Sequence, residues 1–214
     1  TPHYMSLRGL QWQNEFRYLT RHSEGEFDLE VLPHDRMDST NNRAVVTPQH
    51  QGDNRVAGTY KHKQTFNPLW SGNVDLRGVS DKEYLDDFGD NLGITSQTHL
   101  PQNAQLDYRG PLWNFSARAA DYQTVDRTIA PADRPYARLP QLNLTLNRPV
   151  APNRVNYYFE SEAVNFRRNV GMDGERLNLS PALSLPLENS YGFVTPRIGV
   201  RHIAYHLSNT PDQT

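Results

Sequence analysis

The stretch Gln141-Leu142-Asn143-Leu144-Thr145-Leu146-Asn147 decides the fold, because leucine and polar residues alternate through it without a break. Successive side chains of a β-strand point to opposite faces of the sheet, so the three leucines share one face and the polar residues share the other. A helix would scatter both kinds of residue around its axis. The pattern therefore predicts a β-strand with one apolar and one polar face.

The same alternation recurs along most of the chain, in segments that we expect to form about ten strands. These segments are residues 10–18, 26–31, 55–66, 70–77, 100–109, 113–119, 141–147, 155–162, 177–185 and 191–207. Several of them are long for a soluble sheet and approach the roughly 9–11 residues of a tilted membrane strand.

The composition supports a sheet with only one apolar face. Hydrophobic residues make up 36% of the chain and the mean hydropathy is −0.78, which is little for a core buried on all sides. The 22 basic and 24 acidic residues nearly balance, and no basic stripe predicts nucleic-acid binding. The absence of cysteine excludes thiol catalysis and cysteine-ligated zinc within this chain. No apolar stretch has the length of a membrane helix, and we expect no signal peptide within these residues.

The connections between the expected strands alternate between short and long. The short connections are residues 20–25, 67–68, 110–111, 148–153 and 188–190, and the long ones are 33–54, 79–97, 124–135 and 168–175. Outer-membrane barrels have short periplasmic turns and long extracellular loops. We therefore predict an all-β fold, a segment of a transmembrane antiparallel β-barrel.

Aromatic residues gather beside the short connections. We expect them to form one interface belt against membrane lipids. These residues are Tyr18, Phe66, Trp70, Tyr108, Trp113, Tyr191 and Phe193.

Charged residues of both signs lie on the polar faces of the expected strands. A water-filled lumen would solvate such residues, and they could form hydrogen bonds with sugars passing through it, although plain solvation explains each of them individually. This predicted polar wall comprises Glu15, Arg17, Lys61, Asp75, Arg77, Asp107, Arg109, Arg118, Glu160 and Glu162.

Two local features interrupt the strand pattern. Ser80-Asp81-Lys82-Glu83 fits a helix capping box and Gly89 could end a helix of about two turns, although a plain loop is the alternative. Prolines remove a hydrogen bond from a strand, so we expect bulges or strand ends at Pro101, Pro140, Pro181 and Pro196.

No catalytic or cofactor site is expected. His202 and His206 would share a strand face but lie about 13 Å apart, too far to bind one ion. No nucleophile motif supports a Ser-His-Asp set. The acidic residues Asp81, Glu83, Asp86, Asp87 and Asp90 lack the spacing of a calcium loop and are expected to be solvated. Alternatively, such carboxylates could meet divalent ions outside the cell.

Seven motifs, in this order, resemble the family of lipopolysaccharide (LPS)-assembly outer-membrane barrel proteins (the LptD family). They are Met5-Ser6-Leu7-Arg8-Gly9-Leu10, Glu15-Phe16-Arg17-Tyr18-Leu19, Val79-Ser80-Asp81-Lys82-Glu83-Tyr84, Ser96-Gln97-Thr98-His99-Leu100-Pro101, Leu139-Pro140-Gln141-Leu142, Asn165-Phe166-Arg167-Arg168 and Tyr191-Gly192-Phe193-Val194-Thr195-Pro196.

The resemblance implies a location in the outer membrane of a Gram-negative bacterium and insertion of LPS into the outer leaflet, without chemistry and without a cofactor. It also implies an LptE-like lipoprotein plug inside the barrel and a periplasmic jelly-roll domain that receives LPS from a bridge protein. We expect residues 1–214 to be an internal part of the barrel, which lacks the jelly roll, the remaining strands and the family's cysteines. The alternatives are a porin-like passive channel and a soluble carbohydrate-binding β-sandwich.

Overall fold

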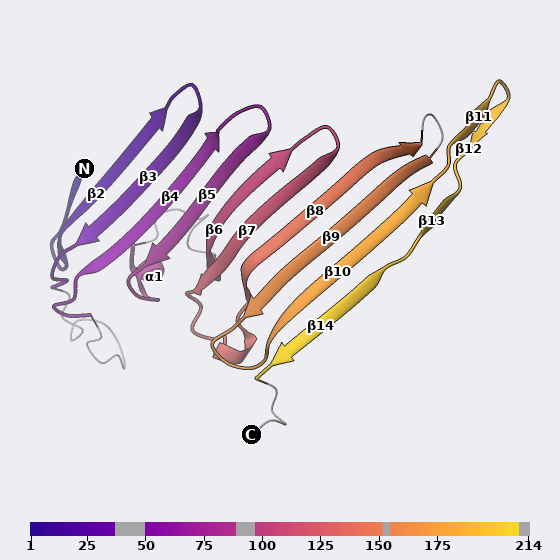
Figure 1. The fold of residues 1–214 in the computed structure, drawn as a ribbon. Helices are drawn as coiled ribbons and strands as arrows, with labels where there is room; N and C mark the ends of the chain where they lie inside the picture. The colour runs from indigo at the N-terminus through magenta and orange to yellow at the C-terminus, as the bar shows by residue number, and fades with distance from the viewer. Residues whose placement is uncertain (37–49, 89–96, 152–154, 210–214) are drawn as a thin grey trace. The chain divides into compact units, whose positions relative to one another are not determined.

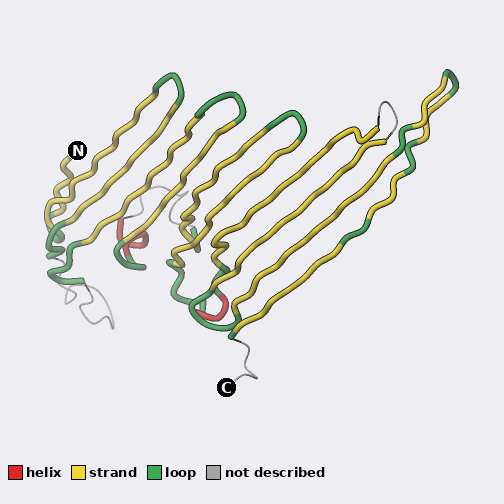
Figure 2. The backbone as a smooth tube through the Cα atoms, viewed as in Figure 1, coloured by secondary structure: helices red, strands yellow, loops and turns green. Residues whose placement is uncertain are grey.

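The computed structural model describes residues 1–36, 50–88, 97–151 and 155–209. Most of the described chain is antiparallel β-strand, drawn in yellow in Figure 2, and the helices are short. None of the described helices is long and apolar enough to cross a membrane.

Twelve strands form one sheet, in which β1 to β10 follow one another in chain order. Both β13 and β14 pair with β10, and β11 and β12 form a separate two-stranded sheet. The strand bounds are β1 Pro2–Met5, β2 Gly9–Leu19, β3 Ser23–Leu32, β4 Arg55–Thr65, β5 Trp70–Val79, β6 His99–Arg109, β7 Trp113–Thr124, β8 Ala137–Ala151, β9 Val155–Arg167, β10 Asp173–Ser184, β11 Leu187–Asn189, β12 Gly192–Val194, β13 Arg197–Gly199 and β14 His202–Ser208.

The chain divides into two compact units, and each is described by itself. The first comprises residues 1–64, 74–102 and 122–130, and the second comprises residues 65–73, 103–121 and 131–214. Strands β2 and β3 lie wholly in the first unit, as does β4 except for its last residue, Thr65 (Figure 1).

The register of the first unit confirms the faces predicted for its strands. Phe16 pairs with Phe27, and Phe27 pairs with Tyr60, so these aromatic side chains share one face. The neighbouring row, Arg17, Glu26 and Lys61, lies on the other face, which we call the polar face. Many large apolar side chains are exposed, as expected if lipid is to cover them; Phe16, for example, is 61% exposed.

In the second unit the predicted leucine strand is the middle of β8. Leu142, Ala163, Leu177 and Ala204 pair successively across β8, β9, β10 and β14 and share one face (Figure 1). The expected bulge at Pro140 is confirmed, because the register shifts between Arg138 and Gln141.

The prediction of one continuous strand over residues 191–207 is wrong. Residues 191–207 form three strands, β12, β13 and β14, in place of one. Pro196 lies between β12 and β13 as expected, whereas Pro181 lies inside β10, where the pairing with β9 is unbroken. On its other side β10 pairs with β14 through Leu179 and with β13 from Ala182, so Pro181 separates two pairing partners.

The small buried core of the first unit lies under the short helix α1 (Tyr84–Phe88). It contains Tyr84, Leu85, Leu100 and Val125. The prediction of a helix in this connection is confirmed, but it begins later than the expected capping box. Ser80 does not cap it, since its hydroxyl accepts a hydrogen bond from the backbone N–H of Val56 at 3.0 Å. Gly89, the predicted end, lies outside the described residues.

Leu100 was expected among the outward apolar side chains, and this expectation is wrong. It is 3% exposed and belongs to the cluster with Tyr84 and Leu85.

The predicted alternation of lengths is confirmed for the six connections from β2 to β8. It is wrong for residues 168–175, because β10 begins at Asp173 and only residues 168–172 join β9 to β10. Residues 20–22, 66–69 and 110–112 join hairpins, whereas residues 33–54, 80–98 and 125–136 form the longer connections. The 3-10 helix η2 (Pro131–Asp133) lies in the last of these.

Candidate functional site

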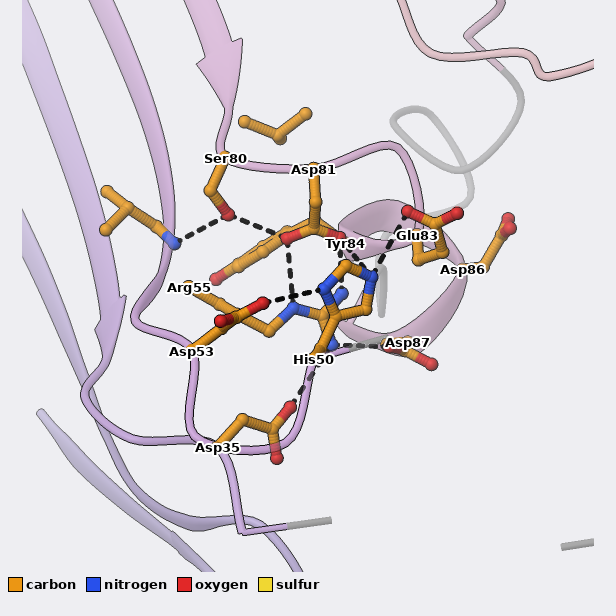
Figure 3. A network of polar contacts seen from close by, with 12 residues as sticks. Asp35, His50, Asp53, Arg55, Ser80, Asp81, Glu83, Tyr84, Asp86 and Asp87 are labelled. Carbon is orange, nitrogen blue, oxygen red and sulfur yellow. Dashed lines mark hydrogen bonds and ion pairs between the residues drawn. The ribbon is translucent and has the colours of Figure 1, made fainter. Parts of the chain in front are cut away.

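Arg55, the first residue of β4, is the centre of a buried polar network in the first unit (Figure 3). Its Nε and Nη2 donate to the two carboxylate oxygens of Asp81 at 3.0 and 2.7 Å, a bidentate pair. Its Nη1 donates to Asp87 at 2.5 Å and to Asp35 at 3.2 Å. Four hydrogen bonds thus join the start of β4 to the segment after β3 and to the α1 region.

Arg8, in the turn between β1 and β2, adds a second positive charge to this network. It donates to Asp35 at 2.8 Å and to Asp87 at 2.9 Å. The guanidinium groups of Arg8 and Arg55 lie 4.7 and 4.8 Å from the ring centroid of Phe88. Phe88 therefore adds cation–π contacts to the ion pairs.

Tyr84 connects α1 to the polar face of β2 and β3. Its hydroxyl donates to Glu30 at 2.8 Å and accepts from the side-chain amide of Gln11 at 3.0 Å. Gln11 and Glu30 belong to the same alternating rows as Glu15 and Asp28. The helix consequently covers the polar face and not the apolar one.

Burial changes the acidity of two groups in the α1 region. The pKa of the Tyr84 hydroxyl is raised, first by burial and then by its hydrogen bond to Glu30. Burial alone would raise the pKa of Asp81, but hydrogen bonds from Arg55 and Ser80 outweigh it and lower that pKa. Both shifts favour the state in which the network is complete, with a neutral phenol and an ionised carboxylate.

The acidic cluster read from the sequence is therefore only partly solvated. Asp81, Glu83, Asp86 and Asp87 all carry ion pairs to arginine or histidine, and Asp90 lies outside the described residues. The sequence interpretation missed the partners Arg8, Gln11, Asp35 and Arg55. One signal was available for Arg55, since it directly follows a long connection that contains Asp35 and Asp53.

The arrangement consists of paired charges and hydrogen-bonding groups that join separate segments of the chain. The guanidinium groups are saturated by carboxylates, and Asp35 is fully buried. The chemistry available is the fixing of α1 and its flanking segments on the polar face.

The predicted wall residues of the first unit form ion pairs along the polar face. Arg17 lies 2.5 Å from Glu15 and 3.4 Å from Glu26, and Lys61 lies 4.0 Å from Glu26. Asp75 and Arg77 pair at 2.9 Å. These residues are brought together by register, although each pair is partly exposed.

The predicted wall residues of the second unit are more dispersed. Glu162 accepts from Arg176 at 2.5 Å and from Gln141 at 2.7 Å, and Arg118 donates to Asn103 at 3.0 Å. The remaining positions are as follows: Glu160 pairs in register with Thr145 and Ser180, Asp107 accepts from Gln105, and Arg109 ends β6.

The predicted aromatic belt is brought together in part. In the second unit Tyr108 lies between Trp70 and Trp113, with ring centroids 5.0 and 4.0 Å apart, and Phe66 lies close to Gly72. In the first unit Tyr18 contacts Phe16 and His62. Tyr191 and Phe193 are separate from these clusters, because they lie on the β11–β12 hairpin and are 98% and 79% exposed.

These features define a class of protein. Long antiparallel strands that pair in chain order, with an exposed apolar face and a face of paired charges, form a segment of a membrane β-barrel. The comparison with protein families makes this class specific. The family described as LPS transport system D (LptD) matches residues 53–214, and the chain belongs to this family.

Similar proteins cover almost the whole chain. LPS-assembly protein LptD of Nitrosococcus oceani is 36% identical over 216 residues, which include 100% of this chain and 28% of the relative. The proteins of the same name from Aromatoleum aromaticum and Alcanivorax borkumensis are each 37% identical, covering 96% and 98% of this chain and 24% and 26% of the relatives. The chain thus spans about a quarter of the length of the curated relatives that it matches.

Proposed function

We propose that the chain is part of the outer-membrane barrel of an LPS-assembly protein and helps to deliver LPS to the outer leaflet without chemical modification. The observation that carries this proposal is the match along the whole chain to relatives named LPS-assembly protein LptD. The two-faced strands support it, because the apolar face can meet lipid and the charged face can meet water and sugar. The same match favours LPS assembly over a porin-like channel or a carbohydrate-binding sandwich.

The proposal includes an orientation and partners. The short connections would face the periplasm, the long connections and α1 would face outside, and the polar wall would line the lumen around an LptE-like plug. A jelly-roll domain elsewhere in the full-length protein would receive LPS from the bridge protein. The ion pairs between Arg17, Glu26 and Lys61 support a hydrated wall, since such partly exposed pairs cost little where water remains.

Depletion of the full-length protein in its own host tests this function. Newly made LPS should fall at the cell surface and accumulate inside, as measured with a surface-impermeant LPS probe, and a plasmid copy should restore it. Depletion of an abundant porin serves as the control and should leave surface LPS unchanged. Normal surface LPS together with slower uptake of small solutes would instead support the porin-like channel.

A further inference from the structure

His50 lies at the exposed side of the Arg55 network with its ring between three carboxylates (Figure 3). Its Nε2 lies 3.3 Å from Oε2 of Glu83 and 3.7 Å from Oδ1 of Asp81. Its Nδ1 lies 3.3 Å from Oδ2 of Asp53. One imidazole nitrogen and two carboxylate oxygens therefore converge on one point, and the other nitrogen has a carboxylate of its own.

Each of the two converging carboxylates is held in place from behind. Arg127 lies 2.7 Å from Oε1 of Glu83, which leaves Oε2 directed at His50. Arg55 binds both oxygens of Asp81, and Ser80 donates to Oδ2 at 2.7 Å. Such outer contacts are typical of metal sites, where they fix the orientation of the ligands.

The position of His50 is also fixed. Gly52 has a φ of +87°, a conformation that favours glycine, and its N–H donates to the backbone carbonyl of Asp35 at 2.8 Å. The backbone N–H of Asp53 donates to the carbonyl of His50 at 3.0 Å. The carboxylate of Asp53 can accept a hydrogen bond from the Nδ1–H group of His50. In this tautomer Nε2 carries no proton and has a lone pair for a metal ion.

The distances suit a coordinated cation better than a direct ion pair. Charge-assisted N–H···O bonds are usually about 2.7–2.9 Å long, and both contacts of Nε2 of His50 are longer. Two ligands of a tetrahedral zinc ion, each at about 2.1 Å from it, lie roughly 3.4 Å apart. The Nε2–oxygen distances of 3.3 and 3.7 Å lie on either side of that value.

We propose that His50, Asp81 and Glu83 bind one divalent transition-metal ion, with Zn²⁺ as the best fit and water as a fourth ligand. An imidazole ligand disfavours Ca²⁺ and Mg²⁺, which prefer oxygen, whereas zinc takes histidine with carboxylates. The other group of acidic side chains close enough to share an ion among the described residues, Glu15, Glu26 and Asp28, contains no histidine.

The bound ion would tie the segment before β4 to the segment before α1. His50 belongs to the first of these segments, whereas Asp81 and Glu83 belong to the second. The bound ion would therefore hold the α1 region against the start of β4. The proposed metal site does not depend on the proposed transport function.

Zinc binding to the full-length protein in detergent tests the proposal. After removal of metal with a chelator, zinc is titrated in competition with a chromophoric chelator at pH 7.5, and bound metal is counted by mass spectrometry of the native protein. His50→Gln should lose one equivalent of zinc, with affinity at that site falling roughly 100-fold or more. Asp53→Asn should weaken the same site by roughly 10-fold, as expected for an outer partner of a ligand.

His22→Gln is the matched control, because His22 lies exposed in the turn between β2 and β3. It should retain all the zinc of the wild type, and heat-modifiable mobility should show that every variant is folded. X-ray absorption of the zinc should show a shell of nitrogen or oxygen neighbours with the outer-shell scattering of one imidazole ring, and this signal should disappear in His50→Gln. Equal zinc binding by wild type and His50→Gln would overturn the proposal, as would a loss of zinc in Glu26→Gln but not in His50→Gln.

Discussion

The guanidinium of Arg55 lies 3.2 Å from the carboxylate of Asp35, and only 1% and 0% of these side chains are exposed. The two residues are separated by the whole connection between β3 and β4. A buried ion pair is costly to form, but it is more costly to break, because the remaining charge stays buried without a partner.

We predict that Arg55→Met destabilises the first unit by about 3–5 kcal/mol, because Asp35, Asp81 and Asp87 lose their shared partner. Urea unfolding of the full-length protein, followed by heat-modifiable mobility, measures this change. Arg127→Met is the control, since Arg127 is 52% exposed and its pair should contribute no more than about 1 kcal/mol. Similar losses in both variants would show that the Arg55 network is not special.

We predict opposite tolerance on the two faces of β8. Leu144→Arg should cost roughly 2–4 kcal/mol if Leu144 faces lipid near the middle of the bilayer, whereas Asn143→Arg should be nearly neutral on the polar face. Asn143 gives up only a 3.3 Å hydrogen bond to Ser116. Reversible refolding into lipid vesicles measures both variants. Equal costs would mean that the faces are assigned incorrectly.

The proposed orientation can be tested by cysteine labelling on intact cells. Asp86→Cys, in α1, should react with an impermeant maleimide, because Asp86 is 76% exposed and α1 would face outside. Pro68→Cys and Pro111→Cys, in short connections, should react only after the outer membrane is permeabilised. The reverse pattern of labelling would invert the orientation.

Tyr84→Phe should destabilise the protein by about 1–3 kcal/mol, because Gln11 loses a buried partner and Glu30 loses a donor. The pKa of the Tyr84 hydroxyl is raised in the folded state. Its stabilising contribution should therefore be complete below about pH 10, the pKa of an unfolded tyrosine, and decline as the pH rises through the folded-state pKa.

Urea unfolding of wild type and Tyr84→Phe at a series of pH values measures this difference. Absorbance at 295 nm should show one tyrosine fewer among those that stay protonated above pH 10. A stability difference that grew with pH would contradict the assignment.

Strand positions and faces could be predicted from the sequence because they depend on local alternation. Phe16, Phe27 and Tyr60 share a face as their spacing requires. The network around Arg55 could not be predicted in this way, since its partners come from separate connections and only register and loop folding bring them together. The division of residues 191–207 into three strands was missed because Pro196 was expected to end or bulge one strand, not to accompany a change of partner.

The composition of the Arg55 network has a consequence for the order of folding. Its charged members, Arg8, Asp35, Arg55, Asp81 and Asp87, come from segments on both sides of β2, β3, β4 and β5. A contact between such distant segments requires the intervening loops to close first. The network should therefore assemble late and add little to the speed of folding, while slowing unfolding. The network would form only after the hairpins have paired in the correct register, and its main effect would be to lower the rate of unfolding.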